Sequence, residues 1–413
     1  MSTTRIRLRH IAQINPSTPS FDKLHDDDEL TFLPMEAVWP GSRLDISQRR
    51  TKQEVSTGYT RFQDGDVLVP KITPTFEAGR AVLIQGLLGG VGAGTTELHV
   101  VRPGKDIDPR FLLYVVNTHQ FLKLGEAEMY GVAGQQRVPD GFLRDLPVLL
   151  PSLESQCRIA DFLDAETARI DQLMALRERQ RRLLQAHQDA SVRHLFSEAT
   201  TYRTRLKFLL ASRPRYGVLV PKFEEGGVKF IRVNDLLDLP ARADNLITIA
   251  PEVSAQYPTT EVRSGDVLVS VVGTLGRAAV APSSVAGANV NRAIAVLRPK
   301  PGVDRQLLTT WINTADFQEQ ALLATGNDSA QRTLGMEDMA NFSLQWPSNE
   351  SSQVQLAHAV LRSTEMARKL ERKLQRQTAA LAERRQALIT AAVTGQFDVS
   401  TASGRNVTEG VTV

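Results

Sequence analysis

The hexapeptide DGDVLV at residues 64–69 returns as SGDVLV at residues 264–269. Shorter strings recur around it in the same order: GRAV at 79–82 as GRAA at 276–279, VRP at 101–103 as LRP at 297–299, NT at 117–118 as NT at 313–314, and QR at 136–137 as QR at 331–332. Each repeat then runs through a proline, Pro151 or Pro347, into a long polar stretch. The sequence therefore predicts the order globule, helix, globule, helix. A duplicated chain of this kind can fold with a pseudo-two-fold axis, which suits a ligand or partner that itself has two halves.

Each globule is predicted to be a mixed α/β module. β-type runs lie between Gly and Pro turns at 66–69, 81–84 and 98–101 in the first repeat, and at 267–272, 278–281 and 293–297 in the second. One amphipathic helix is expected after these runs in each repeat, over 109–124 and over 305–323. We therefore expect two copies of one α/β fold.

The two polar stretches predict long helices. Residues 152–196 and 350–393 contain neither proline nor glycine, and Gly395 ends the second stretch. Inward-facing positions are expected in the first helix at Ile159, Leu163, Ile170, Leu173, Gln180, Leu184 and His187, and in the second at Val360, Ala367, Leu374, Leu381 and Leu388, with Leu370 and Ala391 beside that row. Each helix would span about 65 Å, and a helix that long buries its stripe only against another long helix. An antiparallel coiled-coil pair would hold the globules at opposite ends, whereas two separate surface helices are the alternative.

These features divide the chain into five segments. The first globule covers 1–150, the central helix 151–199, the second globule 200–347 and the distal helix 348–397. The polar, small-residue segment 398–413 is expected to be a disordered tail.

Composition is that of a water-soluble protein, and we expect a cytoplasmic one. The 413 residues are 42% hydrophobic, include a single cysteine, and contain no apolar run long enough for a membrane helix or a signal peptide. The net charge is only +3, with 17 Lys and Arg against 18 Asp and Glu in 1–150, and 16 against 14 in 201–347. Neither globule is broadly basic, so any contact with nucleic acid must come from local basic patches.

Several motifs typical of catalytic sites are absent from the sequence. GGVGAGTT at 89–96 lacks the lysine of a phosphate loop and the spacing of a dinucleotide loop, so a flexible turn is predicted there. NPST at 15–18 lacks the second proline and the aromatic ring of an adenine methyltransferase loop. The seven histidines show no metal-binding spacing, and no serine stands in a nucleophile elbow. The chain is therefore predicted to be non-catalytic, with no metal site and no cofactor of its own.

Polar loops at matching places in the two repeats are the candidate binding residues. Glutamine and arginine are the side chains that pair bidentately with adenine and guanine edges in the major groove. Each candidate could be an ordinary solvated loop residue, but recurrence in both repeats favours a shared function. The candidate set is Lys71, Thr73, Arg80, Gln135, Gln136, Arg137, Arg213, Arg215, Tyr216, Arg277, Asn289, Asn291, Arg292, Gln331 and Arg332.

Several strings resemble one family. LPSLESQCRIADFLD at 150–164, continued by ETARID at 166–171, is similar to the central region of type I restriction–modification specificity subunits. KITP at 71–74 and TELHVVRP at 96–103 look like that family's target-recognition domains, and RRQALITAAVTG at 384–395 resembles its closing helix. QVQLA at 353–357 departs from the family's Gln-x-x-Ile-Ala pattern, which leaves the register of the second helix open.

The resemblance implies a non-catalytic DNA-recognition subunit. Each globule would be a target-recognition domain that reads one half of a bipartite double-stranded DNA target, and the helices would set the spacer. It also implies two adenine-methylating modification subunits and motor-nuclease restriction subunits as partners, so that S-adenosylmethionine, ATP and Mg²⁺ would belong to those partners. A coiled-coil scaffold whose globules bind other proteins is the alternative of a different class, and an enzyme with an unrecognised site is a third. Salt-dependent, sequence-selective binding of duplex DNA would separate the first hypothesis from both.

Overall fold

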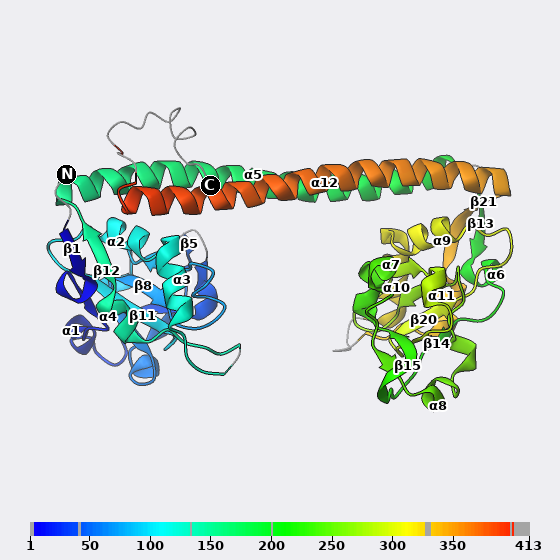
Figure 1. Cartoon of the computed structure of the whole chain (residues 1–413), viewed down its shortest axis with the longest axis horizontal. Helices are drawn as coiled ribbons and strands as arrows, with labels where there is room; N and C mark the ends of the chain where they lie inside the picture. The colour runs from blue at the N-terminus through cyan, green and yellow to red at the C-terminus, as the bar shows by residue number, and fades with distance from the viewer. Residues whose placement is uncertain are drawn as a thin grey trace. The chain divides into compact units, whose positions relative to one another are not determined.

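The structure is a computed structural model that describes residues 4–39, 43–132, 134–199, 201–326, 332–396 and 399. Apart from Val399, the predicted disordered tail lies outside the described residues. The chain forms two compact units, Met1–Glu178 with Gln375–Val413 and Arg179–Leu374. Each unit is an α/β globule that carries part of both long helices (Figure 1).

Among the described residues, the globule of the first unit contains two four-stranded sheets, a two-stranded ladder and a short pair of strands, β4 (Val38–Trp39) with β5 (Arg43–Leu44). One sheet is antiparallel, with the order β2 (Ala12–Ile14), β11 (Leu98–Pro103), β8 (Val67–Pro70), β9 (Val82–Leu83). The other contains a parallel pair, β3 with β10, in the order β6 (Arg49–Thr51), β3 (Glu29–Leu33), β10 (Val91–Gly94), β7 (Thr60–Gln63). The ladder joins β1 (Thr4–Arg7) to β12 (Pro147–Leu150), which leads into the first long helix.

The second unit repeats this topology. Its antiparallel sheet has the order β14 (Arg215–Tyr216), β20 (Ile294–Leu297), β17 (Val267–Ser270), β18 (Ala278–Val280). A parallel pair recurs as β15 (Phe223–Ile231) with β19 (Asn289–Val290), with β16 (Thr248–Ile249) antiparallel to β15. A ladder recurs as β13 (Thr201–Arg205) with β21 (Ser343–Pro347). The prediction of two copies of one α/β fold is therefore confirmed.

The repeated hexapeptide builds the same turn and ion pair in both units. Its glycine has a φ of 90° in the first unit and 86° in the second, a conformation that glycine adopts without strain. Asp66 then accepts from Arg102 Nε at 2.7 Å and Nη2 at 2.9 Å, and Asp266 accepts from Arg298 at 3.0 and 2.9 Å. The two aspartates are 0% and 2% exposed. A buried carboxylate needs a paired cation. Each ion pair therefore ties the strand that the hexapeptide begins to the strand beside it, β8 to β11 in the first unit and β17 to β20 in the second.

The prediction of one helix after these strands is wrong in both repeats, because each predicted helix is two helices in the structure. The first is divided into α2 (Pro109–Val115) and α3 (His119–Ala127), and the second into α9 (Arg305–Ile312) and α10 (Ala315–Thr325). The recurring Asn-Thr dipeptide stands at each break. Asn117 donates its side-chain amide to Leu113 O at 2.9 Å, while the Thr118 hydroxyl accepts from Phe121 N at 3.2 Å and caps the next helix.

The flexible turn predicted for 89–96 is also wrong, because the middle half of this segment is strand β10 (Val91–Gly94). β10 lies between β3 and β7 and is buried along its length. A β-carbon on Gly92 would collide with the Phe62 ring, and one on Gly94 with Leu33 O. The glycines therefore allow neighbouring groups to pack closely, and they do not supply flexibility.

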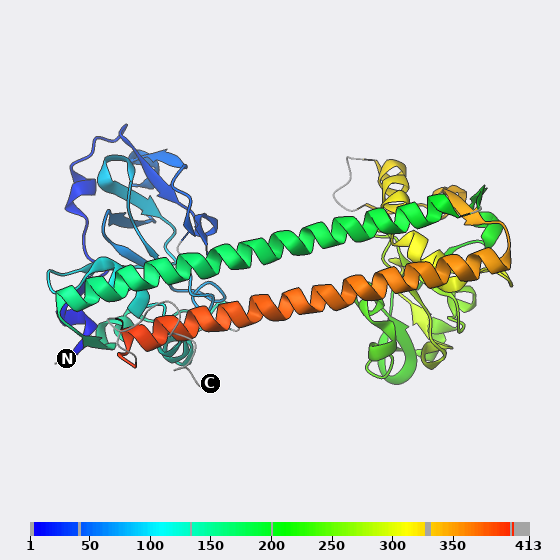
Figure 2. The same cartoon turned by 90° about the horizontal axis from the view of Figure 1, so that it is seen from above.

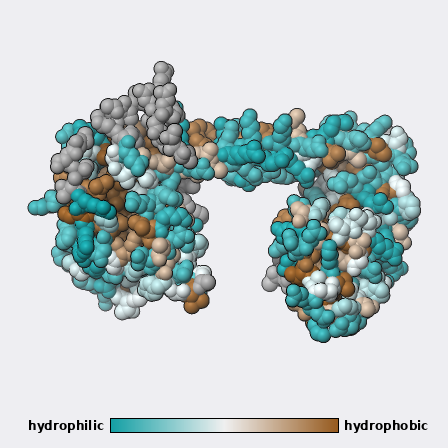
Figure 3. Space-filling model, in the orientation of Figure 1, coloured by the Kyte–Doolittle hydropathy of each residue, from teal (hydrophilic) through white to brown (hydrophobic). Residues whose placement is uncertain are grey.

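The long helices α5 (Leu153–Glu198) and α12 (Glu350–Val393) pack against each other in antiparallel orientation (Figures 1 and 2). In the first unit Asp171 accepts from Arg385 Nε at 3.0 Å, and in the second Gln188 Nε2 donates to Thr364 Oγ1 at 3.1 Å. Partner numbers therefore rise along one helix as they fall along the other. The surface of the pair visible in Figure 3 is largely hydrophilic, as expected when the apolar stripes face inward.

The predicted stripe is confirmed for α12 and partly wrong for α5. In α12, Val360, Leu374 and Leu388 are buried, whereas Leu370 is exposed. In α5 the buried stripe continues from Ile170 to Met174, so Leu173, Gln180 and His187 are exposed. In an antiparallel helix pair, inward-facing residues follow one another at intervals of three or four residues. The prediction placed the residue after Ile170 three positions on, at Leu173, whereas in the structure it lies four positions on, at Met174.

One glutamine joins each long helix to its globule. Gln156 Oε1 accepts from Asp108 N at 2.8 Å, and Gln353 Oε1 accepts from Asp304 N at 2.9 Å. Asp108 and Asp304 in turn cap α2 and α9. The register that QVQLA left open is therefore the same in both repeats.

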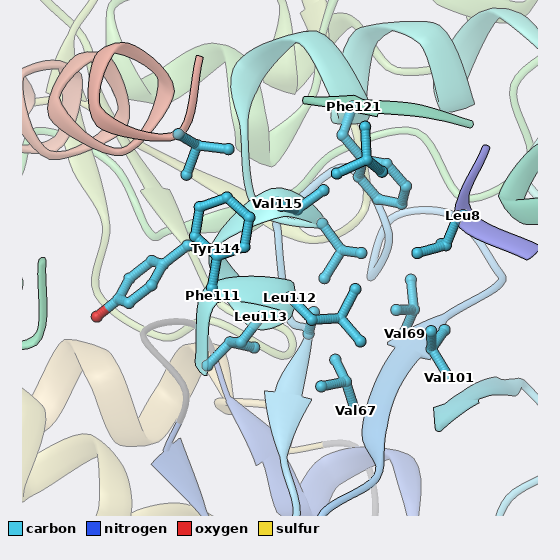
Figure 4. Packing of buried hydrophobic residues seen from close by; sticks show 14 of the residues in the cluster. Leu8, Val67, Val69, Val101, Phe111, Leu112, Leu113, Tyr114, Val115 and Phe121 are labelled. Atoms are coloured by element: carbon cyan, nitrogen blue, oxygen red, sulfur yellow. The ribbon is translucent and has the colours of Figure 1, made fainter. Parts of the chain in front are cut away.

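The core of the first unit runs from the sheet into the long helices. Side chains of β8, β11 and α2 meet in one cluster with α3, as Figure 4 shows for Val67, Val101, Leu112 and Phe121. The same cluster includes apolar side chains of α5 and α12. The antiparallel sheet of this unit and its long helices thus share one cluster, whereas two further clusters lie within the globule itself.

Replacing Asp66 with alanine should lower the free energy of unfolding of the first unit by about 3–5 kcal/mol, because Arg102 loses its partner in a buried site. Glu126→Ala is the matched control, since its ion pair with Lys123 is exposed and should be worth less than about 1 kcal/mol. Denaturant unfolding, with hydrogen exchange to assign the transition to β8 and β11, measures both. A loss for Asp66→Ala no larger than the control's would show that the ion pair does not stabilise the sheet.

Candidate nucleic-acid interface

Two polar segments singled out in the sequence form one structure. Thr73 N donates to Gln136 O at 3.0 Å, and Val138 N donates to Lys71 O at 2.9 Å. Tyr130 and Arg137 exchange backbone hydrogen bonds of 3.1 and 2.9 Å, which closes a hairpin. We call residues 71–73, 130–132 and 134–138 the first loop pair.

The second unit contains the equivalent pairing. Gly273 N donates to Arg332 O at 3.0 Å, and Leu334 N donates to Val271 O at 2.8 Å. We call residues 271–273 and 332–334 the second loop pair. The pairing equates Gln136 with Arg332, so the sequence match of the two QR dipeptides is off by one residue. Gln331 lies outside the described residues.

Acidic and carbonyl groups of the protein hold both cations of the first loop pair. Arg137 donates Nε and Nη2 to the two carboxylate oxygens of Glu97 at 2.9 and 2.8 Å. These hydrogen bonds lower the pKa of Glu97 and raise the pKa of Arg137. Lys71 Nζ donates to Thr96 O at 2.8 Å, and burial lowers its pKa. Arg137 would therefore have to give up a two-point contact before it could form one with a base.

The two remaining candidates of the 71–80 segment are partly enclosed. Thr73 Oγ1 and Arg80 Nε are buried and have no hydrogen-bond partner among the described residues. Arg277, the counterpart of Arg80, lines a groove of about 890 Å³ between α5, α9, β18 and α12. No residue of the second loop pair lines that groove, although the Arg277 backbone pairs with Ser270, which directly precedes the loop pair.

The two candidate asparagines of the second globule, Asn289 and Asn291, form hydrogen bonds within the protein. Asn289 is 0% exposed, and its side chain bonds with Thr260, Ser254 and Tyr257. It is therefore not available to a ligand, which corrects its place in the candidate set. Asn291 Oδ1 accepts from Ala293 N at 2.8 Å and holds a turn.

Exposed cations lie near the second loop pair. Arg213, Arg215 and Arg292 are exposed, and Arg332 is half-buried. Tyr216 Oη donates to Leu334 O at 2.8 Å, which brings β14 with its arginine against the second loop pair. Arg215, next to Tyr216, and Arg292, next to the Ala293 that pairs with Val271, are therefore exposed cations close to the second loop pair, whereas no contact among the described residues places Arg213 beside it.

Several exposed apolar residues near both loop pairs were not predicted from the sequence. Tyr130 and Val132 are 63% and 79% exposed at the tip of the first, and Leu219 and Val220 are 57% and 74% exposed near Arg292. A large apolar side chain beside a glycine-flanked loop was the available signal. Glu97 gave no signal, because its role depends on an arginine forty residues away in sequence.

His99 is buried beneath the first loop pair. Its Nε2 bonds to Val138 O at 2.9 Å and its Nδ1 to the Asn15 side-chain amide at 3.1 Å. Burial, assisted by the nearby Lys71, lowers the pKa of His99 to about 4. The ring is therefore neutral at physiological pH.

Among the residues that the structure describes, no group of three or more His, Cys, Asp or Glu could hold a metal ion. Within the same residues, no helix is both long enough and apolar enough to cross a membrane.

Acid should destabilise the first unit through His99. Between pH 6.5 and about 4 the unfolded chain binds a proton that the folded chain excludes, so stability falls with falling pH. The His99 contribution should amount to about 2 kcal/mol between pH 7 and pH 5. Unfolding measured at both pH values in wild type and His99→Gln checks this, since the variant should lose that part of the pH dependence. An identical pH dependence in the two proteins would contradict it.

The chain is similar to proteins of type I restriction systems. No family model matches the chain. It is 42% identical over 158 residues to the type I restriction enzyme EcoEI specificity subunit of Escherichia coli, covering 37% of this chain and 26% of that protein. It is 40% identical over 173 residues to the EcoAI specificity subunit of Escherichia coli, covering 41% of this chain and 27% of that protein. The chain thus spans about a quarter of the length of these two relatives.

The fold comparison extends over nearly the whole chain. A chain from a structural study of complex assembly and conformational transition in the type I R-M system aligns with a TM-score of 0.73 and 18% identity, over 96% of this chain and 98% of that chain. At that identity the match shows the fold alone. The resemblance to type I restriction–modification specificity subunits is therefore confirmed, in sequence over about two fifths of the chain and in fold over almost all of it.

Proposed function

We propose that this chain is the DNA sequence-specificity subunit of a type I restriction–modification complex. The observation that carries the proposal is the recurrence of one loop pair, with the same backbone pairing, in two units that dock on the long helices through the same glutamine contact. Each loop pair would bind one half of a bipartite double-stranded DNA target. The similarity to specificity subunits supports this assignment.

The exposed polar groups of each loop pair would make the DNA contacts. In the first unit these are Gln135, which is exposed, and Gln136, which is half-buried. In the second they are Arg332 and the exposed arginines Arg213, Arg215 and Arg292. Glutamine suits adenine edges, whereas arginine suits guanine edges and phosphates.

The partners and cofactors follow from the same proposal. Two adenine-methylating subunits and motor-nuclease subunits would associate with the chain, and S-adenosylmethionine, ATP and Mg²⁺ would be bound by them. The chain itself would be non-catalytic, so the purified protein should show no methyltransferase, nuclease or ATPase turnover.

The test is to purify the chain with its modification partner and map adenine methylation in the host genome. A two-part motif with a fixed spacer supports the proposal, and duplex competition at two salt concentrations should show salt-dependent, sequence-selective binding. Capture of proteins without any sequence-selective duplex binding would instead favour the coiled-coil scaffold.

Replacing residues 1–150 with the first globule of a relative that has another target should change one half of the motif and leave the other half unchanged. The donor globule must supply a backbone N–H at the position of Asp108, because Gln156 of the retained helix accepts a hydrogen bond from it. Methylation mapping of the hybrid complex decides the matter. A change in both halves would contradict independent reading by the two units.

Inserting seven residues after Glu178 and seven after Leu374 should lengthen the spacer by about three base pairs, since seven residues add about 10 Å of helix. The two sites are equally far along their helices from the paired residues Gln188 and Thr364, so both apolar stripes should remain in phase. Inserting seven residues in α5 alone is the control and should disrupt the pairing. An active double-insertion complex with an unchanged spacer would show that the helices do not set the distance.

Gln135→Ala should weaken discrimination at one position of the first half-site by about 1–3 kcal/mol without lowering thermal stability, because the side chain is exposed. Arg137→Ala is the matched comparison and should lower stability, because it leaves Glu97 without its partner. Competition binding on cognate and single-mismatch duplexes, together with thermal unfolding, measures both effects. Unchanged discrimination in Gln135→Ala would exclude this side chain from base contact.

A further inference from the structure

One backbone carbonyl is held by a side chain in both loop pairs, but the side chains are unrelated. Val138 and Leu334 occupy equivalent positions, since each donates its N–H to the strand opposite, at Lys71 O and Val271 O. The two residues are 2% and 0% exposed. A carbonyl at such a buried position requires a donor from the protein.

In the first unit the donor is His99. Val138 O can only accept, so Nε2 of the ring carries the proton of the 2.9 Å hydrogen bond. Nδ1 then accepts from Asn15 Nδ2 at 3.1 Å, and Asn15 Oδ1 accepts from Val100 N at 2.9 Å. Each donor in this series of hydrogen bonds therefore meets an acceptor, and this requirement defines the tautomer of His99.

In the second unit the donor comes from the neighbouring strand. His99 stands opposite Val69, and its counterpart opposite Val269 is Ala295, which has no side-chain donor. Tyr216 is the direct cross-strand partner of Ala295, and its Oη reaches Leu334 O at 2.8 Å. A methyl group at the position of the imidazole leaves space for the tyrosine ring to cross to the same carbonyl.

We propose that His99 and Tyr216 are positioning residues that hold the two loop pairs in the geometry required for DNA recognition, each acting on its own half-site. This inference rests on the proposed function. Neither side chain would touch DNA, because each acts through the carbonyl that it binds. It also gives Tyr216 a role other than the direct DNA contact expected from the sequence.

Hydrogen exchange on the free chain tests the anchors without DNA. His99→Leu should speed exchange of the Val138 amide by about tenfold or more, while His99→Gln, which retains an N–H donor of similar reach, should restore slow exchange. Tyr216→Phe should act in the same way on Leu334 and leave Val138 unchanged. Amides of β10 serve as the control for global unfolding. Unchanged exchange at Val138 and Leu334 would overturn the anchor role.

Half-site discrimination tests the positioning role in the complex with the modification partner. His99→Leu should reduce discrimination against single mismatches by about tenfold in the first half-site alone, with rescue by His99→Gln, and Tyr216→Phe should do so in the second alone. Faster exchange combined with unaltered discrimination in a selective complex would overturn the positioning role. A wild-type complex that binds all duplexes equally would overturn the proposed function instead, and the exchange result would still report on the anchors.

Discussion

Asp66 and Asp266 lose their water when the two units fold, and each recovers the lost solvation through a two-point contact with an arginine on the next strand. That contact joins the strand that the hexapeptide begins, β8 or β17, to the strand that carries Arg102 or Arg298. β8 and β17 each end where one arm of the loop pair begins. In the first unit, β11 supplies His99 and directly follows Glu97. The candidate interface therefore depends on an ion pair that does not itself belong to it.

The first loop pair is electrostatically satisfied before any DNA arrives. Glu97 holds Arg137, and a backbone carbonyl holds Lys71. Glutamine side chains remain at the surface, so neutral hydrogen-bonding groups would carry much of the reading in this unit. The second loop pair differs, because the exposed arginines Arg215 and Arg292 lie close to it. The two halves of the molecule thus offer different chemistry on one backbone frame.

The long helices and the globules are not independent parts. Gln156 and Gln353 satisfy backbone N–H groups at the start of α2 and α9, and apolar side chains of α5 and α12 enter the core of the first unit. An exchange of globules must preserve these contacts. This coupling explains why the glutamine recurs in both repeats.

The sequence by itself determined the duplication, the α/β class, the two long helices and the resemblance to a family, because each of these is written in local periodicity or in recurring strings. It also located both arms of the first loop pair. It did not determine the helix break at Asn117, the strand at the glycine-rich segment or the inward row of α5 beyond Ile170, since each depends on packing against residues distant in sequence. Tertiary structure alone decided that Arg137 belongs to Glu97, that Asn289 is a buried support, and that His99 and Tyr216 hold equivalent carbonyls. The physical reason is the same in each case: a polar side chain takes its role from the partner that folding brings within about 3 Å, and that partner cannot be read from its own stretch of sequence.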